Sequence, residues 1–143
     1  MHKGFTLIEI TTVIAIMIII AGVTIPFYTY FQTFSVLESS KSEVVQLIRL
    51  TQEKAKSGFN NSNHGVYFNS AQYTLYQGNS YADREQAQDQ IHQLPQNIAF
   101  SGLGEINFTT KTSLPSNNGD INLTHQVTSN VETISINSEG LIY

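Results

Sequence analysis

A single acidic residue interrupts the most apolar part of the chain. Glu9 is the only charged residue from Phe5 to Ile25. As a helix rising about 1.5 Å per residue, this run would span roughly 32 Å, close to the hydrocarbon thickness of a bilayer. An ionised carboxylate in that environment costs on the order of a few kcal/mol unless a positive group lies beside it. The pattern therefore predicts a membrane-length helix in which Glu9 needs a cationic partner.

Two ordinary explanations of this run fit less well. A cleaved signal peptide has an apolar core of about 7–15 residues followed by a small-residue cleavage site. This run is longer, and Ala21-Gly22-Val23 offers no such site. A plain anchor gains nothing from Glu9, unless that side chain merely reaches the membrane interface. Lys3, the only formal charge before the run, favours a cytoplasmic N-terminus and a polar remainder outside.

The residues around this carboxylate resemble the N-terminus of type IV prepilins. They read Lys3-Gly4-Phe5-Thr6-Leu7-Ile8-Glu9-Ile10, followed by Val13-Ile14-Ala15-Ile16 and Pro26. The resemblance implies cleavage by a prepilin peptidase after Gly4 and N-methylation of the new terminal residue, Phe5. It also implies that Glu9 pairs with the N-terminal ammonium of a neighbouring subunit. Such a pair would set the register of assembly, because an unpaired charge is penalised at low dielectric.

The rest of the chain offers no comparable site for catalysis or metal binding. The four histidines are His2, His64, His92 and His125. They lack metal-ligand spacing, so each is expected on the surface or half buried. Asp83, Glu85 and Asp89 are close in sequence, but the ligand pattern of a calcium loop is missing. Without cysteine, a nucleophile–base arrangement or a phosphate loop, we expect no enzyme activity, no cofactor and no metal.

The charge balance also argues against direct binding of nucleic acid. The net charge is −4, and after Lys56 only Arg84 and Lys111 are basic, against seven acidic residues. Phosphate binding relies on clustered lysine and arginine, which this part of the chain lacks. We therefore expect no direct contact with DNA, although membership of a DNA-uptake machine stays open.

One long helix is predicted to position the N-terminal residues. Pro26 follows the apolar run and predicts a kink. The aromatic residues after it, Phe27 to Phe31, suit either the membrane–water boundary or packing against neighbouring helices. From residue 35 to 57, apolar residues recur on one helical face, and Gly58 is a plausible stop. These apolar residues are Leu37, Val44, Ile48 and Ala55.

Beyond Gly58 the sequence alternates between apolar and polar residues, as strands with one buried face do. Strands are predicted at His64–Phe68, Gln72–Tyr76, Asn97–Phe100, Glu105–Thr109, Asp120–His125, Glu132–Asn137 and Leu141–Tyr143. Between them, the glutamine-rich stretch Ala82–Leu94 is expected to form a short helix or an ordered loop.

The expected fold class is α+β and pilin-like. It comprises a leader (residues 1–4), a long helix (5–57, with 5–25 transmembrane and 35–57 an amphipathic spine) and a small antiparallel β-sheet head (58–143). The head also resembles the GspH/FimT-like branch of minor pilins and pseudopilins. The segments that carry this resemblance are Leu50–Ala55, Gly65–Phe68, Tyr73–Tyr76, Gly119–Leu123 and Ile134–Gly140. The absence of the cysteine pair of many major pilins fits a minor pilin, a pseudopilin or a small major pilin.

These resemblances imply a structural subunit of a type IV pilus, a competence pilus or a type II secretion pseudopilus. The implied partners are other subunits, the prepilin peptidase/N-methyltransferase, the inner-membrane assembly platform and membrane lipid. The protein would be a single-pass inner-membrane protein with its head outside, and a surface or periplasmic filament after assembly. The alternative is a filament-tip module that captures a surface, a secreted protein or DNA. Its cue would be an exposed aromatic patch, using Tyr76 or Tyr81.

Overall fold

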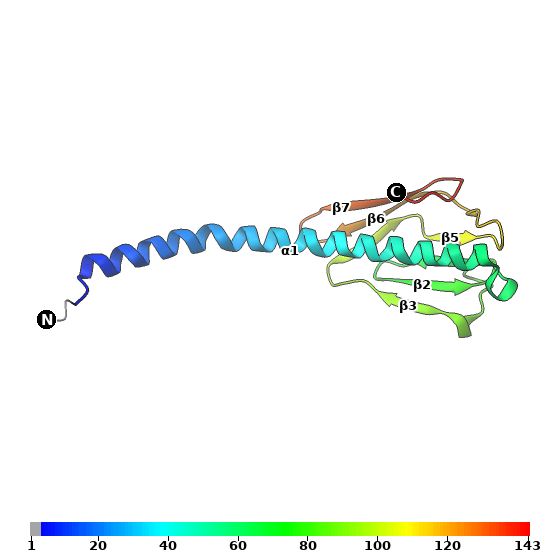
Figure 1. The fold of residues 1–143 in the computed structure, drawn as a ribbon, viewed down its shortest axis with the longest axis horizontal. Helices are drawn as coiled ribbons and strands as arrows, with labels where there is room; N and C mark the ends of the chain where they lie inside the picture. The colour runs from blue at the N-terminus through cyan, green and yellow to red at the C-terminus, as the bar shows by residue number, and fades with distance from the viewer. Residues whose placement is uncertain (1–3) are drawn as a thin grey trace. The chain divides into compact units, whose positions relative to one another are not determined.

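The structure, a computed structural model, describes residues 4–143, apart from the side chains of residues 25, 26 and 29. The described residues form an α+β fold in which helix α1 (Leu7–Ser57) precedes seven strands (Figure 1). Two short 3-10 helices are also present. The first, η1 (Phe59–Asn61), lies between α1 and the first strand, and the second, η2 (Gln86–Gln88), lies between the second and third strands. The chain divides into two compact units, Met1–Ser35 and Val36–Tyr143, which are described in turn.

Helix α1 has a defined signal at each end. Thr6 precedes its first residue and exchanges hydrogen bonds with Glu9, the arrangement known as a capping box. At the other end Gly58 adopts a left-handed conformation (φ 68°), and its N–H donates to the Ala55 carbonyl at 3.0 Å. The Lys111 N–H donates to the same carbonyl at 2.8 Å. Glycine suits this position because it adopts positive φ without a steric cost.

The predicted kink at Pro26 stays a prediction. The backbone is helical without interruption from residue 7 to residue 57, so a proline at position 26 does not end the helix. The side chain of Pro26 lies outside the described residues. The leader residues Met1, His2 and Lys3 also lie outside the described residues. The orientation predicted from Lys3 therefore stays a prediction.

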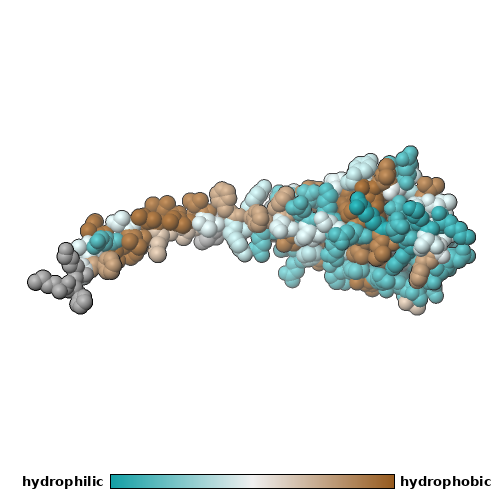
Figure 2. Space-filling view, viewed as in Figure 1, coloured by the Kyte–Doolittle hydropathy of each residue, from teal (hydrophilic) through white to brown (hydrophobic). Residues whose placement is uncertain are grey.

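The first unit presents apolar side chains around the helix. Residues Leu7–Thr24 are long enough and apolar enough to cross a membrane, criteria that signal sequences near an N-terminus also meet. Within Leu7–Thr24, the exposed fraction of the large apolar side chains runs from 51% at Ile10 to 84% at Leu7. Figure 2 shows apolar side chains over most of the visible face of this segment. A helix that is apolar all round needs lipid or other protein around it.

The head contains two antiparallel sheets, where the sequence had suggested one. The first comprises β1 (His64–Phe68), β2 (Gln72–Gln77), β3 (Gln90–Gln93) and β5 (Glu105–Phe108), in the order β3-β2-β1-β5. The second comprises β4 (Ile98–Gly102), β6 (Gly119–His125) and β7 (Val131–Ile136), in the order β4-β6-β7. After β5, Pro115 makes a single bridge to Phe108 and has no N–H with which to extend a ladder.

The spine of the helix packs into the core of the second unit, as its periodicity predicted. Leu37, Ile48 and Ala55 are fully buried, and Val44 is 1% exposed. In Figure 1 this part of α1 lies across the strands of the head. The same core contains the inward-facing residues of both sheets, among them Ile106, Phe108, Ile121, Leu123 and Ile134. The helix therefore supplies one wall of a single hydrophobic core.

Three local expectations differ from the structure. The stretch Ala82–Leu94 contains a 3-10 turn, η2, and a strand, β3, where a short helix or a loop was expected. Of the residues expected on or near the surface, His64 and His125 are instead buried, at 5% and 8% exposure. At the C-terminus, Ile142 makes an isolated bridge to Ile136 in place of a full strand. The other predicted strands are present within one to three residues of their expected ends.

Candidate functional site

The carboxylate of Glu9 is held at the start of α1 by its own chain. The N–H and the hydroxyl of Thr6 both donate to Glu9 Oε2, each at 2.8 Å. In return the Glu9 N–H donates to Thr6 Oγ1 at 3.4 Å. Within residues 4–143, the other carboxylate oxygen, Oε1, accepts no hydrogen bond. One oxygen thus caps the helix, while the second remains available to a further donor.

Phe5 and Gly4, the residues at the expected cleavage position, carry no role in the fold. Phe5 is 86% exposed. A Cβ built on Gly4 would meet nothing within 4 Å, and its backbone is not in the region that favours glycine. Neither packing nor backbone geometry therefore requires glycine at position 4.

The first turns of the helix also present an open, mostly apolar surface that includes Phe5, Ile8, Glu9 and Val13. All of these residues come from one short segment, so they do not enclose a binding cavity. Glu9 is its acidic member. Any partner that covers this surface would meet an exposed carboxylate surrounded by apolar side chains.

In the head, the acidic residues 83, 85 and 89 do not converge on one point. Asp83 accepts from the Ser80 hydroxyl at 3.2 Å, and Glu85 accepts from the Gln77 amide at 3.0 Å. Asp89 instead pairs with Arg84 at 2.8 Å. Among the described residues, no group of three His, Cys, Asp or Glu side chains could hold a metal ion.

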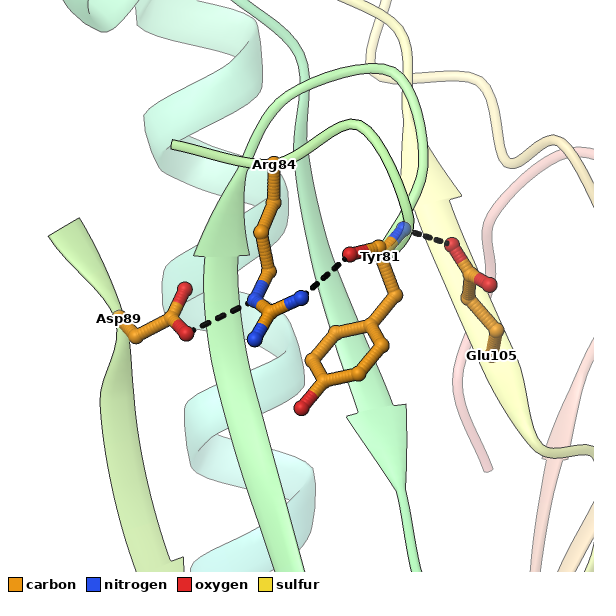
Figure 3. Close-up of polar contacts among 4 residues, drawn as sticks. All are labelled: Tyr81, Arg84, Asp89 and Glu105. Carbon is orange, nitrogen blue, oxygen red and sulfur yellow. Dashed lines mark hydrogen bonds and ion pairs between the residues drawn. The ribbon is translucent and has the colours of Figure 1, made fainter. Parts of the chain in front are cut away.

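Arg84 fastens the loop that precedes β3, and Figure 3 shows its contacts. Its Nε donates to Asp89 Oδ2 at 2.8 Å, and its Nη1 donates to the Tyr81 carbonyl at 2.7 Å. The guanidinium also lies 3.8 Å from the centroid of the Tyr81 ring. The Tyr81 N–H donates to Glu105 Oε1 at 2.8 Å, which ties the loop to β5. Arg84 is thus engaged within the head. Of the two basic residues after Lys56, which are Arg84 and Lys111, Arg84 is therefore not available to a phosphate-binding surface.

The tyrosines proposed as a capture patch pack inside the head. Tyr76 is 2% exposed, and its hydroxyl donates to Glu105 Oε1 at 2.6 Å. The Tyr81 ring stacks on Tyr67 with centroids 3.9 Å apart. Burial, followed by the bond to Glu105, raises the pKa of the Tyr76 phenol above its ordinary value. Tyr76 is therefore a core residue, whereas Tyr81 is half-buried.

The two buried histidines have structural partners. His64 Nε2 lies 3.0 Å from the carbonyl oxygen of Phe59, in the turn after α1. His125 Nδ1 accepts from the Thr128 N–H at 3.3 Å and lies 3.1 Å from the Thr128 hydroxyl. Each histidine thus secures a turn, which explains its burial without a metal. These contacts have no signature in the sequence, because both partners belong to turns.

Comparisons with known proteins add no relative to these observations. A scan against protein-family models, a search of curated proteins and a search of solved structures each found no match.

Proposed function

We propose that this chain is a structural subunit of an extracytoplasmic filament, as a minor pilin or pseudopilin of a type IV pilus, a competence pilus or a type II secretion pseudopilus. In this proposal a prepilin peptidase/N-methyltransferase cleaves after Gly4 and methylates Phe5. The inner-membrane assembly platform then stacks the subunits through their N-terminal helices, with the heads outside. No direct contact with nucleic acid and no enzyme activity are included.

The observation that carries the proposal is the state of Glu9. Its carboxylate sits in the first turn of an apolar, membrane-length helix, with one oxygen capping the helix and Oε1 without a partner in the described chain. In the proposal, the ammonium created at Phe5 of a neighbouring subunit supplies that partner. The pair is favoured because each charge is otherwise uncompensated in an apolar environment.

Two further observations support the proposal. Gly4 meets no neighbour and needs no special backbone angle, which is compatible with a role in recognition by a peptidase. The layout of a long helix whose C-terminal part packs on antiparallel sheets is compatible with a pilin-like architecture. The exposed apolar residues from Leu7 to Thr24 would contact lipid before assembly and other helices after it.

The deciding experiment separates the charge of Glu9 from its capping role. Glu9→Gln removes the charge but keeps an oxygen that can accept from Thr6, since glutamine also serves in capping boxes. Thr6→Ala removes the hydroxyl of the capping box and keeps the charge of Glu9 and the backbone N–H that donates to it. In cells that assemble the filament, we expect Glu9→Gln to lower filament yield at least about tenfold, because an uncompensated buried charge is strongly penalised.

Thr6→Ala should assemble close to the wild-type level, and both variants should be found in the membrane fraction. Normal filament yield with Glu9→Gln would show that charge pairing is wrong. Normal assembly of Glu9→Gln together with failure of Thr6→Ala would assign Glu9 a role in capping only.

A further inference from the structure

A small pocket lies where the last turns of α1 meet the starts of η1 and β1 and the end of β2. Its volume is about 150 Å³, and its lining is about equally polar and apolar. Drug-sized sites usually occupy roughly 300–1,000 Å³, so this pocket suits a single small unit. This unit is either a free small molecule or one residue that a longer molecule presents outward. The residues that line the pocket decide its chemistry.

Lys54 gives the pocket its charge. The residue lines the pocket and is half-buried, and in the described part of the chain its ammonium makes no ion pair or hydrogen bond. Other lysines of the same helix are engaged: Lys56 pairs with Glu53 at 3.9 Å and Lys41 with Glu132 at 3.0 Å. A ligand that fills the pocket would therefore gain most by presenting an anionic group to Lys54.

The rest of the lining favours a ligand with hydroxyl groups and a C–H face. The Phe59 ring borders the pocket and is 52% exposed. Gln88 and Gln90, both exposed, also line it, and within residues 4–143 their side-chain amides make no hydrogen bond to protein. A carboxamide both donates and accepts, which matches hydroxyl groups, and an aromatic ring offers an apolar face.

The walls are held in place without a ligand. Gln77 accepts from the Asn60 amide at 2.8 Å and donates to Glu85 at 3.0 Å. The bond between His64 Nε2 and the Phe59 carbonyl, at 3.0 Å, fixes the turn that carries the aromatic ring. On the other side, the Arg84–Asp89 pair fastens the segment that leads into Gln90. A preformed pocket loses less entropy on binding than a mobile one.

We propose that this pocket binds a carboxylate-bearing sugar unit, such as a hexuronic acid. The carboxylate faces Lys54, the hydroxyl groups bond the amides of Gln88 and Gln90, and the sugar ring packs on Phe59. The head would thereby recognise acidic polysaccharide. This binding is separate from filament assembly, because none of the pocket residues belongs to the N-terminal segment that contains Glu9.

The test uses the full-length chain in micelles of a detergent without a sugar headgroup. Glucuronate, glucose and glutamate are titrated while the amide NMR signals of the pocket residues are followed. We expect glucuronate to bind, and glucose and glutamate to bind at least about tenfold more weakly. Glucose lacks the carboxylate that faces Lys54, and glutamate lacks the sugar ring and its hydroxyl groups. Equal binding of glucose would overturn the role of Lys54, and equal binding of glutamate would overturn the sugar assignment.

Variants of the lining complete the test. Lys54→Gln should weaken glucuronate binding about tenfold, and Lys54→Arg should largely retain it. Lys56→Gln is the matched control, because Lys56 lies two residues away on the same helix but outside the pocket. Phe59→Ala should weaken glucuronate and glucose alike. Absence of glucuronate binding, or an unchanged affinity in Lys54→Gln, would overturn the proposal, whatever the outcome for filament assembly.

Discussion

Gly65 of β1 lies directly against the side chain of Tyr76, its partner residue in β2. A Cβ at position 65 would overlap the Tyr76 hydroxyl and lie 2.7 Å from the Ile106 carbonyl oxygen. That hydroxyl is fixed from two sides, by its bond to Glu105 and by the Asn107 amide at 3.0 Å. The glycine therefore makes room for a polar network that joins β2 to β5 across β1.

Gly65→Ala is expected to destabilise the head by about 1–3 kcal/mol, the usual cost of overpacking a core. The neighbouring carbonyl belongs to the backbone and cannot move aside cheaply. Urea unfolding of the full-length chain in detergent micelles measures the change. Gly104→Ala is the control, because a Cβ there meets nothing within 4 Å. Similar stability of the two variants would contradict the packing argument.

The same network predicts how stability depends on pH. Burial, followed by the bonds to their carboxylate partners Glu105 and Glu43, raises the pKa values of Tyr76 and Tyr73 above the ordinary value. A raised pKa means that the folded state retains protons which the unfolded state loses near pH 10. The stabilisation is fully present below about pH 10 and is lost as the pH rises beyond it.

Urea unfolding at a series of pH values from 8 upward should therefore show stability falling above about pH 10. Tyr76→Phe should be less stable at pH 8, since its partners lose a hydrogen bond, and should show a shallower alkaline decline. A decline as steep as that of the wild type would assign the pH dependence to other groups.

Residues of the helical spine differ in burial, so substitutions along this part of α1 should lower the free energy of unfolding by different amounts. Ile48 is fully buried, whereas Leu50, two residues further, is 46% exposed. Ile48→Ala should cost about 2–5 kcal/mol through lost apolar contact and the remaining cavity. Leu50→Ala should cost well under half of that value. The free energies of unfolding of the two variants provide the comparison, and equal losses would mean that the helix packs by another face.

Processing can be tested at Gly4 without assembling a filament. In cells that contain a prepilin peptidase, the wild-type chain should appear with the mass of residues 5–143 plus one methyl group. Gly4→Ala should keep the mass of the full chain, because the residue before the cleavage point is changed. Folding should not differ between the two, since a Cβ at Gly4 meets no neighbour. An uncleaved wild type, or normal cleavage of Gly4→Ala, would refute the predicted processing.

Periodicity in the sequence was sufficient for the parts of the fold that bury one regular face. The spine residues and the strands around Val66, Ile106 and Ile134 follow the 3.6-residue and two-residue repeats, and these residues are buried. Strand β3 was missed because it is an edge strand whose residues are mostly exposed, including Ile91 at 60%. The division into two sheets depends on which strands pair across long sequence separations, and local patterns do not encode that pairing.

The candidate sites divide in a similar way. The Thr-x-x-Glu spacing of a capping box was visible in the sequence. From the sequence, however, Glu9 was interpreted only as a charge within a membrane-length helix, and its bond to Thr6 was missed. The clasp formed by Arg84, Asp89 and Tyr81 had no sequence signal, because a bend of the loop brings those side chains together. The pocket at Lys54 was equally hidden, since its lining comes from five separate segments.

The capping box has a consequence for a subunit that leaves a filament. If Glu9 pairs with a neighbour as proposed, separation of the two chains does not strand its carboxylate, since the two donors of Thr6 remain within 2.8 Å. The residue thus keeps two hydrogen-bond donors inside its own chain, although its charge is again uncompensated. Within the proposed function, these local donors would lower the cost of returning a subunit to the membrane.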